Sequence, residues 1–414
     1  MLTCEYPPIG GGGATVCRLL ARAFAALGHR VDVVTAGMPG LAAEENEDGV
    51  RVLRVGGYRR RRHYSTAPEQ ASFLWPMYRT AAGLLGRHRY DVIHSHFIVP
   101  TGWLGYRLSR RFGVPHAITA HGSDVPGYNP DRFGLLHRLL LPEWRRVLHQ
   151  ARWVTSPSHF LAGLIGRHAP VPVTVIPNPF AFEGQLGRRR RKLVLTVSRL
   201  VPRKGIQFLV EAMEGLPEGW ELVVAGDGPS RAALEQQASG LPVRFTGFVS
   251  REKVADLYAE AAIFVLPSLV ENFPMVLLEA MHAGCAVITT DAYGCGELAG
   301  DAGLLVPAED ADSLHRALLR LIGDPAERER LGAAAQRRVR AFTPDRIAGR
   351  FLALFESSGD ITAVEPRSRA EGAAEGRRVL SAAARASRDG SRDGGRKPAA
   401  VRDRGCGRSP FPRS

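Results

Sequence analysis

Two glutamates lie eight positions apart across the junction between a predicted loop and a predicted helix. Glu271 follows the apolar, strand-like run 262–266, and Glu279 stands within the helix-forming stretch 275–283. The free backbone N–H groups of that helix's first turn, near 273–275, could bind an anion. The carboxylates could then accept hydrogen bonds from sugar hydroxyls on either side of a phosphate. Alternatively, Glu271 caps the helix and Glu279 is a solvated helical glutamate, because carboxylates are common in both places.

A second group of candidate residues follows the strand-like run 193–197. Arg199 and Lys204 lie on the same predicted loop. Arg199 offers a planar fork of donors and Lys204 a mobile point charge, a combination that suits a pyrophosphate. Because arginine is common throughout this chain, the loop alone does not establish a site.

A run of glycines at 10–13 precedes the helical run 16–27. Glycine at Gly12 and Gly13 lets backbone amides approach a phosphate closely. A dinucleotide-binding fingerprint is disfavoured, because position 15 is threonine and no acidic residue ends the second predicted strand. A tight turn without a ligand is the other interpretation.

His121 follows the predicted strand 116–120, at the end of the strand where open α/β sheets bind ligands. A lone histidine is more often structural, but this position favours a functional one. His94 and His96 follow a neighbouring apolar run and are expected to line a pocket at most. For Asp124, contact with acceptor or sugar hydroxyls and helix capping are equally compatible with the sequence.

Short apolar runs alternate with helical stretches along the chain, which predicts an α/β fold with parallel sheets. In the first half, the predicted strands are 31–36, 50–55, 92–95, 116–120, 153–156 and 173–177. In the second half, they are 193–198, 222–225, 243–246, 263–266 and 286–290.

Together these segments resemble the retaining glycosyltransferases of family 4, which have the GT-B fold. The match is nearly continuous from 193 to 356 and is thinner in the N-terminal half, at 5–13 and 120–124. The matching elements of the C-terminal half are 198–205, 225–229, 267–268 with the two glutamates, 302–307 and 342–348. The resemblance implies two Rossmann-like domains that face each other across a cleft.

The expected domains follow from this resemblance and from composition. Residues 1–178 are predicted to form an N-terminal Rossmann-like acceptor domain, and residues 193–342 a C-terminal Rossmann-like donor domain for the nucleotide sugar. Residues 179–192 are the predicted linker, and 343–357 a helix that crosses back to the N-terminal domain. Residues 358–414, rich in Arg, Gly, Ala and Ser with little periodicity, are predicted to be a disordered basic tail.

The resemblance also implies a role for each candidate residue. Arg199 and Lys204 would bind the diphosphate of the donor. Glu279 would accept hydrogen bonds from the ribose hydroxyls, and Glu271 would hold hydroxyls of the sugar. His121 would reach the transferred sugar and help to organise the reacting centre. The implied catalytic residues are His121, Glu271, Arg199 and Lys204. The implied donor-binding residues are Gly12, Gly13, Arg199, Lys204, Glu271, Asn272, Phe273, Pro274, Met275 and Glu279.

The reaction of such a family moves a sugar from a nucleoside-diphosphate sugar to an acceptor with retained anomeric configuration. The implied mechanism is same-face attack in which the leaving phosphate helps to deprotonate the acceptor, with no separate enzymatic nucleophile. Asp310 and Asp312 match the spacing of a metal-binding DxD motif, but they open a predicted helix. No metal and no other cofactor is therefore expected, since Arg199, Lys204 and a helix N-terminus can stabilise the diphosphate.

Composition restricts the remaining classes. No apolar run approaches the roughly 18 residues of a spanning helix, and no signal peptide is visible. Five cysteines without a CxxC pair favour a reducing cytoplasm over a zinc site. The net charge of +14 is compatible with solvated loops or with attraction to anionic lipid and anionic substrates, the local candidates being 59–62 and 188–192. No nucleic-acid-binding motif accompanies the charge.

The expected partners are a nucleotide-sugar donor, a glycan or lipid-linked acceptor and an anionic membrane surface, which would place the protein in the cytoplasm or at the inner face of the plasma membrane. The sugar and the base, UDP or GDP, stay open. Two other functions remain: a nucleotide-sugar epimerase on the same fold, which would turn over the donor without an acceptor, and a non-catalytic nucleotide-sugar-binding protein.

Overall fold

The computed structural model describes residues 1–62, 65–182 and 190–357, with the side chains of 130–137 excepted. All of these residues belong to one compact unit. Residues 183–189 of the predicted linker and the predicted tail 358–414 lie outside the described residues. The boundaries proposed between the domains stay a prediction.

The first sheet has eight strands in the order β3-β4-β2-β1-β5-β6-β7-β8. All neighbours are parallel except β3, which pairs with β4 in antiparallel register. Its strands are β1 (Leu2–Thr3), β2 (Val31–Ala36), β3 (Glu44–Glu47), β4 (Val50–Val55), β5 (Ile93–His96), β6 (His116–Thr119), β7 (Trp153–Ser156) and β8 (Thr174–Val175). The helices are α1 (Gly12–Ala26), α2 (Ala67–Arg87), α3 (Trp103–Phe112), α4 (Pro130–Gln150) and α5 (His159–His168).

The second sheet has six parallel strands in the order β11-β10-β9-β12-β13-β14. They are β9 (Arg191–Val197), β10 (Glu221–Ala225), β11 (Val243–Gly247), β12 (Ala261–Leu266), β13 (Ala286–Thr290) and β14 (Gly303–Val306). The helices are α6 (Ile206–Glu211), α7 (Arg231–Gln237), α8 (Arg251–Glu260), α9 (Met275–His282), α10 (Gly294–Ala299), α11 (Ala311–Gly323), α12 (Pro325–Val339) and α13 (Pro344–Glu356).

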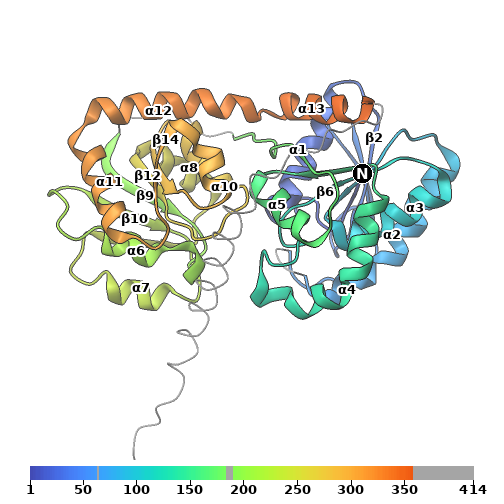
Figure 1. Cartoon of the computed structure of the whole chain (residues 1–414), viewed down its shortest axis with the longest axis horizontal. Helices are drawn as coiled ribbons and strands as arrows, with labels where there is room; N and C mark the ends of the chain where they lie inside the picture. The colour runs from blue at the N-terminus through green and yellow to red at the C-terminus, as the bar shows by residue number, and fades with distance from the viewer. Residues whose placement is uncertain (63–64, 183–189, 358–414) are drawn as a thin grey trace, which may run out of the picture. The chain divides into compact units, whose positions relative to one another are not determined.

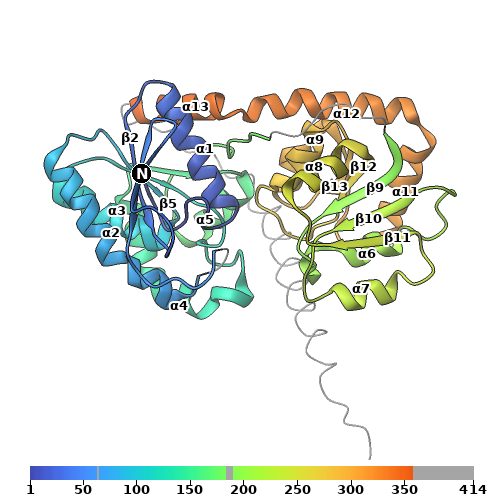
Figure 2. The same cartoon turned by 180° about the vertical axis from the view of Figure 1, so that it is seen from behind.

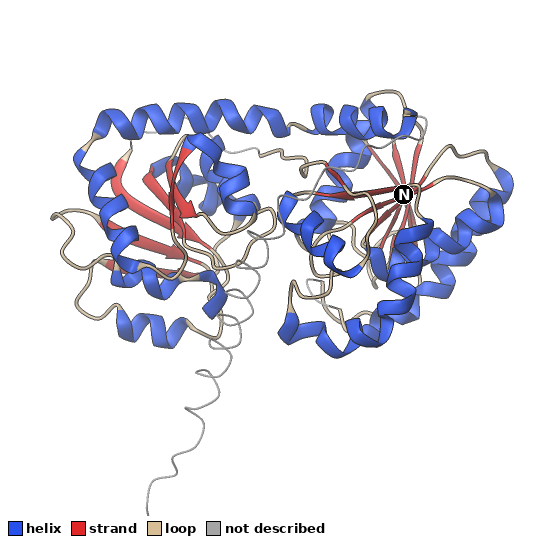
Figure 3. Ribbon diagram, in the orientation of Figure 1, coloured by secondary structure: helices blue, strands red, loops and turns tan. Residues whose placement is uncertain are grey.

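Both sheets are covered by helices on two faces, as Figure 3 shows. In the second sheet, Leu193 and Leu195 pack on the face covered by α8, α9 and α12, while Val194 packs on the face covered by α6 and α11. A strand buried on both faces is apolar at every position, which is why these strands were visible in the sequence as continuous apolar runs. The predicted GT-B architecture of two Rossmann-like α/β domains is confirmed.

Neither β3 nor β14 was predicted from the sequence. β3 consists of Glu44, Glu45, Asn46 and Glu47 and has no apolar pattern, and it forms because it pairs with β4 at the sheet edge. Ion pairs of Arg51 with Glu44 and of Arg54 with Glu45, at 2.7 and 2.6 Å, support that pairing. β14 is a short edge strand that pairs with β13.

The last described helix, α13, packs on the first sheet although it follows the second in the chain. It lies beside α1 in Figure 1 and in Figure 2, where the same molecule is seen from behind. Ile347 and Phe351 are buried in a cluster with Leu20 and Phe24 of α1. Arg350 also donates a hydrogen bond to the carbonyl oxygen of Val175, at 2.8 Å.

The docking of α13 predicts a large effect of Phe351→Ala. Phe351 is 2% exposed and its ring packs edge-on against Phe24 at 6.4 Å, so truncation leaves a cavity. We expect the free energy of unfolding to fall by about 3–5 kcal/mol, measured by urea denaturation. The exposed Glu356 on the same helix provides the control, since Glu356→Ala should have little effect. Equal stability of the two variants would contradict the docking.

Candidate active site

In the second sheet, the direction in which successive strands are added reverses between β9 and β12. β10 and β11 lie on one side of β9, while β12, β13 and β14 lie on the other. The loops that leave the carboxyl ends of β9 and β12 therefore diverge, and such a switch point is where doubly wound sheets bind ligands. Arg199 and Lys204 follow β9 and Glu271 follows β12, so the topology brings together the residues that the sequence singled out.

An ion pair joins the two loops. Lys204 Nζ donates to Glu271 Oε1, and the side chains are only 15% and 11% exposed. Ser268 Oγ donates to the same carboxylate oxygen at 3.3 Å. The loops approach this closely because position 205 is glycine: Gly205 has a φ of +68°, and a Cβ there would lie 1.9 Å from the carbonyl oxygen of Pro267.

Arg199 is exposed and lies on the loop that also carries Lys204. Its guanidinium makes no hydrogen bond or ion pair with any described residue. It is therefore available to an anionic ligand that approaches Lys204.

Glu279 lies on α9, and a buried tyrosine orients it. Tyr258 of α8 is 0% exposed, and its hydroxyl donates to Glu279 Oε2 at 3.0 Å. The pKa of Glu279 is raised by burial, and the hydrogen bond from Tyr258 offsets part of that rise. The solvated-glutamate interpretation of Glu279 is wrong.

Helix α9 begins without a capping side chain. Its N-cap residue is Pro274, so the interpretation of Glu271 as the helix cap is also wrong. Met275 begins the helix and packs with the core of the second sheet, as does Phe273, whose ring lies 5.8 Å from that of Phe342. The backbone N–H groups of the first turn of α9 thus lie next to Glu271 and are available to a bound anion.

Asn272 connects the two sheets instead of presenting its amide to the pair. Its Oδ1 accepts from Ser158 Oγ at 2.5 Å, and its Nδ2 donates to the carbonyl oxygen of His121 at 3.4 Å. Sequence reasoning missed a second connection, made by Glu297 of α10. The Glu297 carboxylate accepts from the backbone N–H groups of His159 and Phe160, at 2.8 and 2.9 Å, in the first turn of α5.

The first sheet has its own switch point, between β1 and β5. Gly12 and Gly13 lie in the first turn of α1, which starts at Gly12, earlier than the predicted 16–27. A Cβ at Gly13 would lie 2.8 Å from Phe97 Cζ and 3.5 Å from His121 Nδ1, so any larger residue there would force the Phe97 ring to shift. The structure therefore brings Gly13 and His121 together.

Asp124 orders the loop that carries His121. Its Oδ1 accepts from the backbone N–H groups of His121 and Gly122, at 3.0 and 2.9 Å, and its Oδ2 from that of Ile98, at 2.7 Å. Both carboxylate oxygens are thus engaged by the backbone in the interior. Neither role suggested by the sequence, capping or sugar contact, is the one that this buried residue has.

The glycine-rich turn is held by an arginine that the sequence grouped with the surface charges. Arg59 is 5% exposed and pairs with Glu5 at 3.3 Å. It also donates to the carbonyl oxygens of Arg61 and Arg62, and Arg62 in turn accepts from the N–H of Gly10. Arg59 is therefore neither a solvated charge nor a lipid-facing one.

Comparisons with known proteins agree with this geometry. The model of the family "Glycosyltransferase Family 4" matches residues 10–183, and that of "Glycosyl transferases group 1" matches residues 180–338. A glycosyltransferase of Methanocaldococcus jannaschii is 32% identical over 359 residues, covering 80% of this chain and 90% of the relative. The chain belongs to the family 4 glycosyltransferases.

Other similarities fit the same family. A Bacillus subtilis glycosyltransferase named for teichuronic acid biosynthesis is 31% identical to this glycosyltransferase, covering 62% of this chain and 69% of the relative. Among solved structures, sucrose-phosphate synthase from Thermosynechococcus elongatus has a TM-score of 0.71 at 26% identity, covering 86% of this chain and 97% of that one.

The described part of this glycosyltransferase has neither a cluster of metal-binding side chains nor a membrane-spanning helix. Within it, no group of three or more His, Cys, Asp and Glu side chains is placed to hold a metal ion. No described helix is both long and apolar enough to cross a membrane. Asp310, part of the DxD-like spacing, caps α11 by accepting from the N–H of Ser313 at 2.8 Å.

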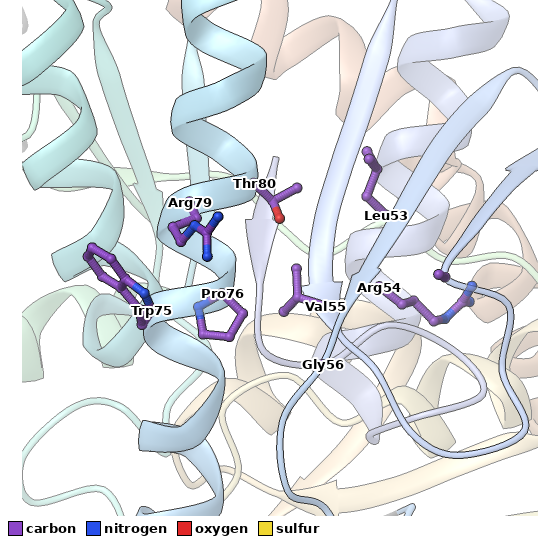
Figure 4. Close-up of a pocket in the computed structure, with 9 residues that line it drawn as sticks. Leu53, Arg54, Val55, Gly56, Trp75, Pro76, Arg79 and Thr80 are labelled. Carbon is purple, nitrogen blue, oxygen red and sulfur yellow. The ribbon is translucent and has the colours of Figure 1, made fainter.

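A groove of about 500 Å³ lies on the first sheet of this glycosyltransferase, between the end of β4 and α2 (Figure 4). Trp75, Pro76, Arg79 and Thr80 of α2 line it, together with Ala43 and Leu53–Gly56. Trp75 is 66% exposed and stacks on Tyr78 at 6.0 Å. The side chain of Arg54 points away from Trp75, and its Nη2 donates to the carbonyl oxygen of Pro7.

Burial disfavours the charged form of four histidines of the first sheet. His94, His96 and His116 are almost fully buried, so they belong to the interior rather than to a pocket lining, and His121 is half-buried. Burial lowers the pKa of His121 to about 4 and that of His116 to about 3, and it lowers the pKa of His94 and of His96 well below the usual range.

These low pKa values predict that stability falls in mild acid. Below the unfolded value of about 6.5, the unfolded chain binds protons that the folded histidines do not, so the free energy of unfolding falls as pH drops from 6.5 toward 4. Each histidine contributes a slope of about 1.4 kcal/mol per pH unit.

We measure the free energy of unfolding by urea denaturation at several pH values. In His116→Asn its dependence on pH should be weaker by the contribution of one histidine, whereas replacement of the exposed His29 by asparagine should leave that dependence unchanged. An unchanged slope in His116→Asn would show that His116 is protonated in the folded protein.

Proposed function

We propose that this glycosyltransferase moves a sugar from a nucleoside-diphosphate sugar to a glycan or lipid-linked precursor of a cell-surface polysaccharide, with retained configuration and without a metal ion. The observation that carries the proposal is the Lys204–Glu271 pair at the switch point, between one loop that also carries exposed Arg199 and another that leads into the uncapped start of α9. A lysine, an arginine and free helix amides directed to one place suit a diphosphate.

In the proposed complex, Arg199, Lys204 and the first-turn amides of α9 bind the diphosphate. Glu279, oriented by Tyr258, accepts from the ribose hydroxyls, which leaves Glu271 for hydroxyls of the sugar. Lys204 then lies between a carboxylate and a phosphate, so its charge serves both.

The transfer itself breaks the bond between the anomeric carbon and the phosphate oxygen. The acceptor hydroxyl oxygen forms the new bond on the same face of the sugar, and its proton passes to the departing phosphate oxygen. Arg199 and Lys204 stabilise the negative charge that develops on that diphosphate, the kind of preorganised electrostatic stabilisation that replaces a metal ion in this proposal.

Acceptor selection is proposed to lie on the first sheet, and the teichuronic-acid name of the Bacillus subtilis relative supports an envelope glycan as its class. The groove beside Trp75 is the surface that we assign to the acceptor, because an exposed aromatic ring can stack on a sugar. A lipid-linked acceptor would place the reaction at the cytoplasmic face of the membrane.

The proposal is tested by a panel of nucleotide sugars on the purified protein in the presence of EDTA, with thermal shift and nucleoside-diphosphate release measured together. Stabilisation by one donor with slow diphosphate release identifies the base and the sugar. Turnover into an isomerised nucleotide sugar without an acceptor would favour an epimerase. Binding without turnover, even with candidate acceptors, would favour a non-catalytic protein, and a requirement for metal would remove that part of the proposal.

Glu279→Ala should weaken donor binding. Loss of a buried, hydrogen-bonded acceptor for the ribose costs about 1–3 kcal/mol, so the dissociation constant measured by calorimetry should rise about 5- to 150-fold. Tyr258→Phe should have a smaller effect, because it removes only the group that orients the carboxylate. Glu218→Ala is the matched control, since Glu218 is exposed near the opposite end of the sheet. Unchanged affinity in Glu279→Ala would exclude the ribose contact.

Lys204→Ala should lower kcat/KM for transfer by about 100- to 1000-fold, the effect of removing one charge-stabilising group. It also leaves Glu271 buried and unpaired, which destabilises the protein. The Lys204→Ala, Glu271→Gln double variant removes that stranded charge, so it should recover stability without recovering activity. Lys192→Ala, at the start of the same strand, should leave both unchanged. Recovery of activity in the double variant would mean that Lys204 acts only through folding.

A further inference from the structure

The buried side chain of His96 contacts that of His121 in the candidate active site. The inference drawn from this contact rests on the proposed function. His96 is the last residue of β5 and is 0% exposed. Its Nδ1 lies 3.0 Å from Nε2 of His121, and its other nitrogen, Nε2, is buried without a hydrogen-bond partner among the described residues. Nothing in the reaction scheme above uses His96.

A single proton lies between the two rings, and the unpartnered nitrogen decides which ring carries it. If His121 Nε2–H were the donor, neutral His96 would carry its proton on the buried Nε2, as an N–H without an acceptor. If His96 Nδ1–H is the donor, Nε2 of His96 is only an unprotonated nitrogen. Buried N–H groups without partners are the rarer arrangement in folded proteins, so the second assignment is favoured.

That assignment determines the other side of the His121 ring. In a neutral imidazole one nitrogen carries the proton, so an accepting Nε2 leaves the proton on Nδ1. Nδ1 of His121 is directed to Gly13, lying 3.5 Å from where a Cβ on Gly13 would be. This nitrogen makes no hydrogen bond with any described residue and is accessible to solvent, so it is open to a ligand.

We propose that His96 is a positioning residue that holds His121 as the Nδ1–H tautomer, so that His121 donates a hydrogen bond to an oxygen of the bound sugar substrate beside the first turn of α1. Free imidazole side chains in water favour the Nε2–H form, so the protein must select the other one. His96 supplies that selection through a single hydrogen bond.

The surroundings of His96 hold its ring in place. His94 packs on it at 4.6 Å between ring centroids, and His94 Nε2 is hydrogen-bonded to Thr119 Oγ1 at 2.7 Å. Phe351 of α13 packs on His94 in turn, at 5.3 Å. The ring of Phe97 packs on that of His121, with 4.6 Å between the ring centroids. A row of rings thus runs from α13 to the candidate active site and leaves His96 little freedom to rotate.

The direct test is a long-range proton–nitrogen NMR spectrum of uniformly ¹⁵N-labelled protein without substrate, which shows which nitrogen of each histidine carries the proton. The His121 signals are identified by their absence from His121→Gln. We expect Nδ1–H for His121, and finding Nε2–H in the unmodified protein would overturn the proposal. This measurement needs no activity, so it does not depend on the proposed function.

Variants of His96 test whether that residue is the cause. In His96→Phe, which keeps a ring but has no donor, His121 should change to the Nε2–H form and kcat should fall about 10- to 100-fold, as for other residues that orient a reacting group. In His96→Asn, whose amide can donate from the position of Nδ1, the Nδ1–H form and most of kcat should be retained. His116→Asn is the matched control, because His116 is buried in the same sheet but bonds Ser95 instead, at 2.9 Å.

The outcomes separate the two proposals. An unchanged tautomer in His96→Phe, or equal losses of kcat in His96→Phe and His96→Asn, would overturn the positioning role. If His96→Phe does not fold, the spectrum of the unmodified protein still decides. If the tautomers behave as expected but no nucleotide sugar is turned over, the positioning of His121 stands and the proposed function fails.

Discussion

The candidate active site depends on one mostly buried ion pair between loops that diverge from adjacent strands. Lys204 and Glu271 each lose hydration, and a pair of this kind contributes little net stability compared with apolar side chains of similar size. Stability is therefore a weak reason for it to be there. Gly205, whose Cβ would overlap Pro267, shows that the backbone is also shaped to bring these loops together. A site that must bind an anion and hydroxyls at one place explains both features.

Much of the fold could be predicted, because a strand covered on both faces is apolar along its whole length. The predicted strands agree with the observed ones within a few residues, and the order β11-β10-β9-β12 then brings together the loops that carry Lys204 and Glu271. β3 could not be found, since it is polar and exists only through pairing with β4. The local sequence pattern indicates which residues are buried and with what period, but it does not indicate which strand a polar edge segment will pair with.

The supporting residues of the site were missed for a related reason. Tyr258, Glu297 and His96 act through residues 21, 138 and 25 positions away in the chain, and nothing in their own neighbourhoods indicates it. Charge was equally uninformative by itself: Arg59 belongs to a basic run, yet it is buried with Glu5 and holds the glycine-rich turn. Residue types at a loop could be assigned from sequence, whereas the groups that orient them required the structure.

The two sheets supply different kinds of hydrogen-bond donor. The loops of the second sheet carry the fixed charges of Arg199 and Lys204, where the diphosphate is proposed to bind. The first sheet offers uncharged donors, the first-turn amides of α1 and His121, whose pKa burial lowers to about 4. A neutral donor can bind a sugar hydroxyl without competing for the diphosphate, and a charged histidine there would attract the phosphate away from Arg199. In the proposed complex, neutral histidines leave the fixed positive charge on the diphosphate side, with Arg199 and Lys204.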